Sequence, residues 1–446
     1  MKDPTPVVTE LLQQLIRNRC VNQGTPESGE EFRNVDTLAS FLEGSGLDLQ
    51  RYESLPGRAS LVSRIEGSDP RAPSLCLMGH IDVVPVNPDG WERDPFGAEL
   101  VDGVVWGRGA VDMLNTTSSM AVAFKNLATQ GFRPRGDLVF FAAADEEALG
   151  QHGAKWMTEN EPDAVRADYC ITEFGGMRFP VPTEGGPKLP VMVGEKGTYW
   201  CTIRVHGTPG HASMPLRTDN ALVTAAEVVR RIAAYQPKTE IHDVWRRFVE
   251  RMEFPEEMTE ALLDPEAFDQ LTENLPVGLA RMLSACTHTT FAPTIMHGGV
   301  KTNVIPDTVD LQLDIRTLPG SSGDDVVAQL KEALGDLFDK IEFVASNEMA
   351  ATESPMDTPL WDTLRKVTRA LVPGSDTVPF LIVGATDARF MRKVGTTSYG
   401  YGLLSERIPF NEFAQMFHGD NERVDQESLR LSTELWVATA MEFLAG

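Results

Sequence analysis

The sequence lacks the long hydrophobic segments that mark membrane-spanning and exported proteins. None of its 446 residues belongs to an uninterrupted apolar run that approaches the ~20 residues needed to cross a bilayer. The N-terminal segment MKDPTPVVTELLQQLIRN has neither the apolar core nor the small-residue cleavage site of a signal peptide. We therefore expect a protein that acts in the cytoplasm and does not bind membranes.

Cysteine is also scarce. The five cysteines are scattered along the chain, and no two of them form a CxxC pair. An odd, dispersed set argues against a disulfide framework, and three of the cysteines lie in apolar, strand-like runs. Buried thiols in a reducing compartment are the expected state, which again favours the cytoplasm.

Positive charge is in short supply as well. The chain has 40 Lys and Arg residues against 65 Asp and Glu residues, for a formal net charge of −25. This excess argues against nucleic acid or an anionic membrane surface as a partner. With 42% hydrophobic and 24% charged residues, the composition is that of a globular protein. The length is sufficient for two domains.

Strand-like and helix-like segments alternate through the first half of the chain, which predicts an α/β layered sheet. From about residue 196 the order becomes βαββαβ, typical of a compact ferredoxin-like domain, and the alternation resumes after about residue 355. We expect a mixed-sheet catalytic domain with helices on both faces, formed by residues 1–195 and 355–446. An inserted domain at residues 196–354 would interrupt it. A segment at about 236–290, rich in Glu, Met and Leu, is expected to add helices to the insertion.

Two ionisable residues stand inside a segment that otherwise reads as a buried strand. The segment LCLMGHIDVVPV, residues 75–86, is almost continuously apolar yet contains His80 and Asp82. Burying either without a partner costs on the order of several kcal/mol. A core histidine satisfied by hydrogen bonds is one explanation. The other is that Asp82, on the same side of the strand, holds one imidazole nitrogen and leaves the second for a metal.

Carboxylates recur where other predicted strands end. Asp112 follows the glycine-flanked loop in VWGRGAVD, where a helix N-cap would also explain it. Asp145, Glu146 and Glu147 end a strongly apolar strand, and adjacent carboxylates repel each other unless cations or protons intervene. A solvated acidic loop is the alternative there. Glu173 ends the apolar run YCIT in the same way.

A second histidine, His418, lies far downstream in the polar segment FHGDNERV. Open α/β sheets bind ligands at the carboxyl ends of their strands, where all these polar residues are predicted to lie. Mixed histidine and carboxylate ligands suit zinc, and two metal ions can share one carboxylate. Each alternative explains one residue, but together they require a series of coincidences. The sequence therefore predicts a metal centre.

Ten short motifs occur in the order in which the M20 metallopeptidases carry them, and the chain resembles this family over nearly its whole length. They are GHIDVVPV, WGRGAVDM, DEEALG, TEFGG, GEKG, HGTPGHAS, GGVKTNVIPD, DIRTLPG, GATDAR and HGDNE. The long helical segment and the context of DIRTLPG look most like the carboxypeptidase S branch, which includes N-acyl amino acid hydrolases. The resemblance implies a hydrolase of amide or peptide bonds.

The resemblance also implies two zinc ions per subunit, with Co²⁺ or Mn²⁺ as alternatives at the same ligands. His80 and Glu173 would hold one ion. Glu147 and His418 would hold the other, and Asp112 would bridge the two.

Two further residues receive catalytic roles by the same resemblance. Asp82 would orient His80. Glu146 would be the general base, which takes a proton from the metal-bridging water and then delivers it to the leaving amine.

For the inserted domain, the resemblance implies a lid that recognises substrate and forms a homodimer. His211 in GHAS resembles a histidine that reaches across the dimer to the tetrahedral oxyanion, although a turn residue is the alternative. Asn303 and Arg316 resemble groups that grip the substrate carboxylate, and Arg389 and Gly402 would line the same pocket from the catalytic domain. For both arginines a structural salt bridge remains open.

The sequence departs from the family pattern in two places. After Asp112 the family usually continues with Lys and Gly, whereas this chain reads Met113-Leu114-Asn115. The motif TEFGG carries Phe174 between the glutamate and the glycines. We expect the metal site to survive, and the loop after Asp112 to affect substrate preference rather than catalysis.

The predicted substrate is a small N-acyl amino acid with a free carboxylate, from which a di-zinc amidohydrolase would release the amino acid. An apolar acyl group would be received by the Met- and Leu-containing helical insert. A dipeptidase or carboxypeptidase of the same family, and a member that binds ligand without catalysis, are the alternatives.

Overall fold

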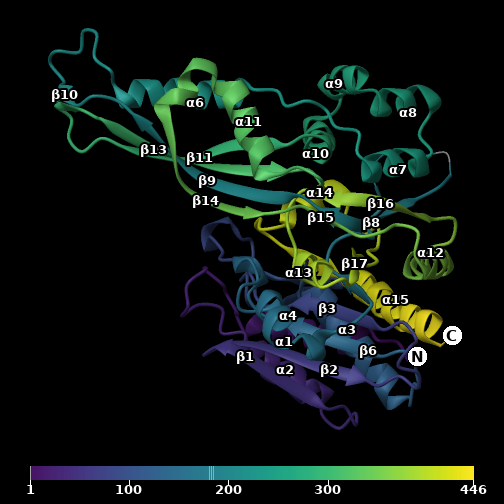
Figure 1. Ribbon diagram of the computed structural model, residues 1–446. Coiled ribbons are helices and arrows are strands. Elements are labelled where there is room, and N and C mark those ends of the chain that lie inside the picture. Colours follow the sequence, from purple (N-terminus) through teal and green to yellow (C-terminus); the bar gives the residue numbers. More distant parts are fainter. Residues whose placement is uncertain (1, 180, 182, 184, 446) are drawn as a thin grey trace.

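The computed structural model describes residues 2–179, 181, 183 and 185–445, and two sheets dominate this part of the chain (Figure 1). Within these residues the larger sheet has nine strands, in the order β1-β2-β6-β3-β7-β17-β8-β15 with β16 also paired to β8. Their bounds, in that order, are Leu49–Leu55, Arg58–Ile65, Leu138–Ala143, Leu75–His80, Tyr169–Thr172, Thr397–Gly400, Lys188–Glu195, Thr352–Glu353 and, for β16, Asp376–Ile382. Strands β6, β3, β7 and β17 run parallel, whereas β1, β2 and β15 are antiparallel to their neighbours, so the sheet is mixed as predicted.

Helices cover both faces of this sheet because its central strands are apolar on both sides. In β3, Leu75 and Leu77 belong to one hydrophobic cluster, and Cys76 and Met78 belong to another, since successive side chains of a strand point to opposite faces. The first cluster includes residues of α1 (Thr5–Arg17), α2 (Phe32–Leu42), α3 (Leu114–Thr129), α12 (Pro359–Leu371) and α15 (Gln426–Leu444). The second includes residues of α4 (Ala154–Asn160), α5 (Pro162–Val165) and α13 (Ala388–Lys393). The predicted α/β class is confirmed.

The segment expected to be one strand over residues 75–86 is shorter in the structure. Strand β3 ends at His80, which pairs with Ala143, the last residue of β6. The N–H of Ile81 still donates to the carbonyl oxygen of Ala143, but the next backbone partner, at Val83, is Cys20 rather than β6, so the chain leaves the sheet. Asp82 therefore lies in the loop after the strand rather than on it.

The smaller sheet, in the order β11-β13-β9-β14, is entirely antiparallel. Its elements follow one another along the chain as β9 (Gly197–His206), α6 (Ala221–Ala234), β11 (Thr290–Gly298), β13 (Thr308–Thr317), α11 (Gly323–Leu334) and β14 (Ile341–Met349). Alternate residues of β13, such as Leu311 and Leu313, pack with Val228 of α6 and Leu330 of α11. This is a two-layer unit with helices on one face. Its role as a lid or dimerisation surface stays a prediction.

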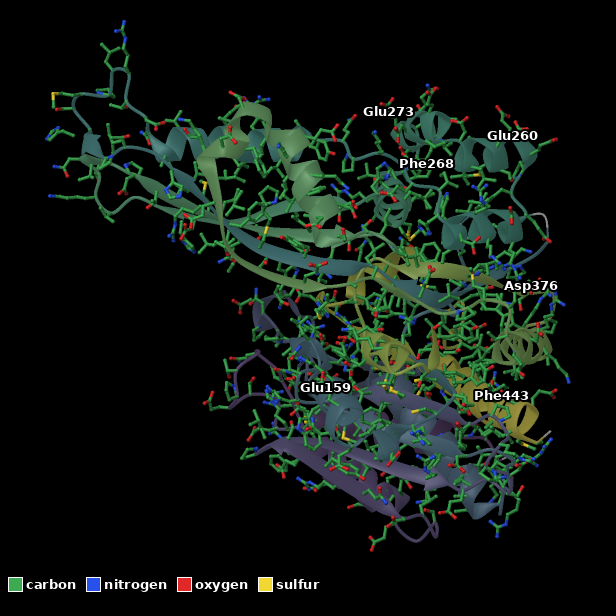
Figure 2. The ribbon with its side chains drawn as sticks, viewed as in Figure 1. Glu159, Glu260, Phe268, Glu273, Asp376 and Phe443 are labelled. Carbon is green, nitrogen blue, oxygen red and sulfur yellow. The ribbon has the colours of Figure 1, made fainter. Side chains whose placement is uncertain are left out.

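Four helices between α6 and β11 form the helical insert. They are α7 (Asp243–Met252), α8 (Glu256–Leu263), α9 (Pro265–Glu273) and α10 (Val277–Thr287). Their apolar side chains pack on the large sheet: the ring of Phe248 lies 5.0 Å from that of Phe380 in β16, and Trp245 contacts Phe248 and Phe268, which is labelled in Figure 2. The apolar side chains of the insert thus form one buried cluster with residues of β8 and β16.

The remaining elements are short. They are β4 (Glu99–Val101), β5 (Val104–Trp106), β10 (Gly210–His211), β12 (Val304–Ile305), α14 (Phe410–Met416), β18 (Arg423–Asp425), and the 3₁₀ turns Pro88–Gly90, Glu146–Ala148 and Gly335–Lys340. Among the described residues, no helix has the length and apolar character required to cross a membrane.

Replacing Phe248 with Ala should lower the free energy of unfolding by about 3–5 kcal/mol, because the fully buried ring leaves a cavity between α7 and β16. Urea denaturation measures the change. Val277→Ala in the same insert is the control, since Val277 is exposed and its truncation should change stability by less than about 0.5 kcal/mol. Equal effects of the two substitutions would contradict the packing of the insert on the sheet.

Candidate metal centre

The predicted metal ligands meet at the carboxyl edge of the large sheet. His80 ends β3, Glu147 follows β6 and Glu173 follows β7. These three strands are parallel neighbours, so their carboxyl ends lie side by side. Asp112, just before α3, and His418, just after α14, reach the same place.

The five side chains form two groups of three that share Asp112. In the first group, His80 Nε2 lies 3.1 Å from Asp112 Oδ1 and 3.7 Å from Glu173 Oε2. In the second, His418 Nε2 lies 3.4 Å from Asp112 Oδ2 and 3.1 Å from Glu147 Oε2. Ligand atoms around a tetrahedral Zn²⁺ are about 3.3 Å apart. The donor sets therefore fit two divalent cations on opposite oxygens of one aspartate.

The helix-cap explanation of Asp112 does not hold. Helix α3 begins at Leu114, its N-cap residue is Met113, and no side chain donates or accepts a hydrogen bond at this cap. Both carboxylate oxygens of Asp112 face histidines instead.

Negative charge exceeds positive charge in this cluster, whose carboxylates and His80 have buried side chains while His418 is exposed. Burial raises the pKa of Glu147 and of Glu173 to about 7, although each lies close to a histidine. Hydrogen bonds to Asp112 and Glu147 raise the pKa of His418 to about 10. Glu147 Oε1 is buried without a hydrogen-bond partner among the described residues. A cation would compensate carboxylates that otherwise need protons, so the residues present fit the predicted metals.

Glu146 belongs to neither group of three. It begins the 3₁₀ turn after β6, and burial, followed by the nearby Glu173 carboxylate, raises its pKa well above the ordinary value. The side chain is therefore free to carry a proton beside the metal groups. Its predicted role as general base remains a prediction.

Asp82 contacts the ring nitrogen of His80 that faces away from Asp112. His80 Nδ1 lies 3.1 Å from the Asp82 carbonyl oxygen and 3.4 Å from Asp82 Oδ1, which leaves Nε2 directed toward Asp112. Asp82 Oδ2 also accepts hydrogen bonds from the backbone N–H of Glu147 at 3.1 Å and from Asn22 Nδ2 at 2.9 Å. The Asp82 carboxylate thereby contacts His80 of the first group and the backbone of Glu147 of the second.

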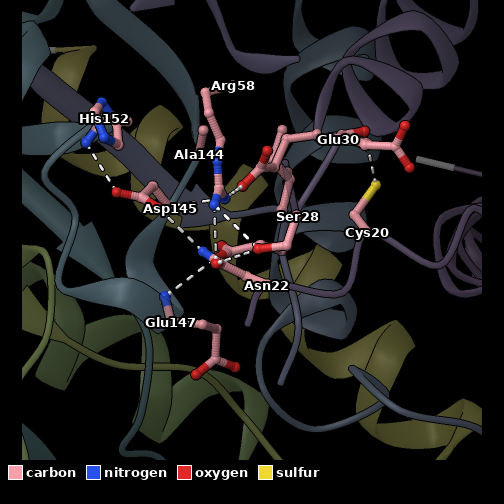
Figure 3. A network of polar contacts seen from close by, with 12 residues as sticks. Cys20, Asn22, Ser28, Glu30, Arg58, Ala144, Asp145, Glu147 and His152 are labelled. Carbon is pink, nitrogen blue, oxygen red and sulfur yellow. Dashed lines mark hydrogen bonds and ion pairs between the residues drawn. The ribbon is translucent and has the colours of Figure 1, made fainter. Parts of the chain in front are cut away.

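A buried arginine, Arg58, joins the polar network that includes Asn22 and Asp145 (Figure 3). Arg58 Nη1 lies 2.6 Å from Glu31 Oε1 and 3.2 Å from Asp145 Oδ1. Asn22 Nδ2 also donates to Asp145 Oδ1, and the N–H of His152 donates to Asp145 Oδ2. Asp145 thus binds neighbouring side chains and backbone, whereas Glu147 of the same acidic triplet contacts His418.

Glu422 is a site residue that the sequence interpretation missed. Its Oε2 accepts hydrogen bonds from Arg108 Nη1 at 2.7 Å and from the N–H of Gly109 at 2.9 Å. Its Oε1 accepts from the N–H groups of Val111 at 2.6 Å and Asp112 at 2.9 Å. The carboxylate holds the loop that presents Asp112. The sequence feature that could have identified Glu422 is its position in the motif HGDNE, four residues after His418.

His211 and Asn303 lie far from the metal groups in this chain. His211 is exposed in β10, which pairs with β12 in a separate two-stranded sheet and lies far from the large sheet (Figure 1). The carbonyl oxygen of Asn303 accepts the N–H of Ala212 at 3.1 Å, so the two residues are neighbours. One protomer alone does not bring them to the site.

The two predicted substrate-binding arginines both have carboxylate neighbours. Arg316 donates to Asp314 Oδ1 at 2.7 Å and Oδ2 at 3.0 Å. Arg389 is buried, donates to the Thr386 carbonyl oxygen and lies 3.9 Å from Glu195 Oε1. The salt-bridge alternative fits the bidentate pair of Arg316 best. Gly402, in contrast, lines a cavity together with Glu173.

A mixed α/β sheet that gathers two histidines and several carboxylates at its carboxyl edge defines a metal-dependent hydrolase. The model of the peptidase family M20/M25/M40 matches residues 76–442, and the chain belongs to that family. It is accordingly a metal-dependent hydrolase of amide or peptide bonds, acting on a small molecule.

Individual relatives agree with this assignment. N-fatty-acyl-amino acid synthase/hydrolase PM20D1 of Xenopus tropicalis is 28% identical over 431 residues, which cover 93% of this chain and 82% of that protein. Aminoacylase-1 of Mus musculus is 26% identical over 434 residues, covering 96% and 93%. The M20 family metallo-carboxypeptidase Sso-CP2 from Sulfolobus solfataricus has the same fold, with a TM-score of 0.72, 18% identity and 99% of both chains covered.

Replacing Glu422 with Gln should weaken metal binding by about 10- to 100-fold. Each carboxylate oxygen of Glu422 accepts two hydrogen bonds, and the amide nitrogen of Gln, at either oxygen's position, would face N–H donors from which it cannot accept. Competition with a chromophoric chelator measures the affinity. Glu159→Gln, at an exposed position labelled in Figure 2, is the matched control. Wild-type affinity in Glu422→Gln would show that the loop does not depend on this carboxylate.

Proposed function

We propose that this hydrolase cleaves the amide bond of small N-acyl amino acids and releases the free amino acid. The observation that carries the proposal is the pair of three-residue groups that share Asp112, with Glu146 beside them. The printed names of the Xenopus and mouse relatives, a hydrolase of N-fatty-acyl-amino acids and an aminoacylase, support this substrate class.

His80 and Glu173 would hold one metal ion, and Glu147 and His418 the other, with Asp112 shared between them. Zinc suits these imidazole and carboxylate donors, although Co²⁺ and Mn²⁺ accept the same ligands. The ions would supply a lowered pKa for water and polarisation of the scissile carbonyl.

The chain's own residues would supply the proton transfers. Glu146 would take a proton from the attacking water and deliver it to the nitrogen of the leaving amine. Asp82 would keep the N–H of His80 Nδ1 engaged, so that Nε2 stays available.

A homodimer would complete the site. The exposed tip of the smaller sheet carries His211 and Asn303, and from a partner subunit these could reach the oxyanion and the substrate carboxylate. Arg316, Arg389 and Gly402 would contribute to the carboxylate pocket within one chain. The five cysteines are free and buried, in keeping with the cytoplasm as the proposed location.

Replacing Glu146 with Gln should lower kcat by about 10²- to 10⁴-fold while the bound metal is unchanged, because the amide cannot accept the proton. Steady-state amino-acid release and metal analysis of the purified variant test both parts. Glu159→Gln should retain wild-type turnover. Normal turnover in Glu146→Gln would rule out the assigned base.

Chelation should abolish amino-acid release, and added Zn²⁺ should restore it. A panel of N-acyl amino acids and dipeptides, assayed with metal-loaded and chelator-treated protein, tests this. Release from dipeptides alone would instead indicate a dipeptidase. No release from any compound, with metal bound, would indicate a member that binds without catalysis.

A further inference from the structure

Asn22 lies between a buried arginine and the carboxylate that contacts His80. It belongs to the segment that connects α1 with α2, and only 2% of its surface is exposed. Its backbone N–H donates to the carbonyl oxygen of Val83 at 2.9 Å, which holds this segment beside the loop that follows β3. The Asn22 side chain is thereby placed next to Arg58 and Asp145 (Figure 3).

Hydrogen-bond donors surround the amide oxygen of Asn22. Its Oδ1 accepts from Arg58 Nη2 at 3.0 Å and from the N–H of Gly24 at 2.9 Å. An arginine side chain has donors and no acceptor, so the oxygen of the Asn22 amide, and not its nitrogen, must face the guanidinium. Arg58 and the backbone of Gly24 therefore determine which way the Asn22 amide points.

The amide nitrogen of Asn22 is consequently directed at two carboxylates. Nδ2 donates to Asp82 Oδ2 at 2.9 Å and to Asp145 Oδ1 at 3.1 Å. An amide nitrogen donates two hydrogen bonds and accepts none, so these two contacts use both of its hydrogens. The N–H of Glu147 is the second donor to Asp82 Oδ2, at 3.1 Å. Together the two donors fix the rotation of the Asp82 carboxylate.

The other oxygen of Asp82 faces the His80 ring. Asp82 Oδ1 is buried without a hydrogen-bond partner among the described residues and lies 3.4 Å from His80 Nδ1. The same ring nitrogen lies 3.1 Å from the carbonyl oxygen of Asp82. Because two acceptors face Nδ1, this nitrogen carries a proton, and the lone pair that a metal ion requires is that of Nε2.

We propose that Asn22 is a positioning residue of the metal centre. Held by Arg58, its amide fixes the Asp82 carboxylate, and Asp82 in turn keeps the proton of His80 on Nδ1 and leaves Nε2 for a metal ion. The inference rests on the metal ligands of the proposed function and is independent of the substrate. It gives the segment between α1 and α2 a role in metal binding, although Asn22 and Arg58 are not candidate ligands.

The test replaces Asn22 with Asp, which keeps the shape of the side chain but exchanges the donating nitrogen for a carboxylate oxygen. Asp82 would lose a donor and gain a charged neighbour, so the affinity for the ion at the His80 group should fall by about 10- to 100-fold. Stepwise titration of the metal-free protein with Co²⁺, followed by visible absorption, measures both affinities. The His80→Ala variant identifies the step that belongs to this group. Excess Co²⁺ should restore kcat in Asn22→Asp, with KM unchanged.

Two control variants separate positioning from stability and charge. Phe248→Ala should destabilise the fold without touching this network and should bind both ions as the wild type does. Asn160→Asp makes the same exchange at an exposed position and should also keep both affinities. If Asn22→Asp does not fold, Asn22→Ala, which removes the donor without adding a charge, should show the same selective weakening.

Wild-type affinity for both ions in the Asn22 variants would overturn the proposal. Equal weakening of both binding steps, or the same weakening in Phe248→Ala, would also overturn it, because a general loss of stability would then explain the effect. Absence of Co²⁺ binding in the wild-type protein would instead overturn the metal ligands of the proposed function.

Discussion

The concentration of carboxylates at one edge of the large sheet is the constraint on which the rest of the site depends. Strands β3, β6 and β7 are parallel neighbours, so the polar residues at their ends converge whether or not they are close in sequence. Burial makes ionised carboxylates costly there, and raises the pKa of Glu147 and Glu173 to about 7. A divalent cation bound at these carboxylates would offset this cost, and the same cation would serve hydrolysis.

A layer of polar residues behind the cluster keeps these groups in place. Glu422 fixes the Asp112 loop through four hydrogen bonds, and Asp82 connects His80 with the backbone of Glu147. Arg58 is paired with two buried carboxylates, those of Glu31 and Asp145. Breaking a buried pair leaves an uncompensated charge, so these residues act on the site and on stability together. The positions of the five candidate ligands thus depend on the polar residues around them as well as on the ligands themselves.

The insertion divides into two parts with different partners. Its four-stranded sheet packs with α6 and α11 and extends away from the large sheet (Figure 1), whereas the insert helices cover β8 and β16. The apolar side chains of those helices pack against residues of β8 and β16.

The sequence by itself determined the α/β class, the mixed central sheet and the grouping of polar residues at strand ends. These follow from local patterns: continuous apolar runs, turn residues and the ordered motifs. Only the tertiary structure decided that Glu422 holds Asp112 across 310 residues, that Asp145 turns to Arg58 while Glu147 turns to His418, and that β3 stops at His80. The physical reason is that these contacts depend on which strands and loops become neighbours in space, and strand order in the sheet is not strand order along the chain.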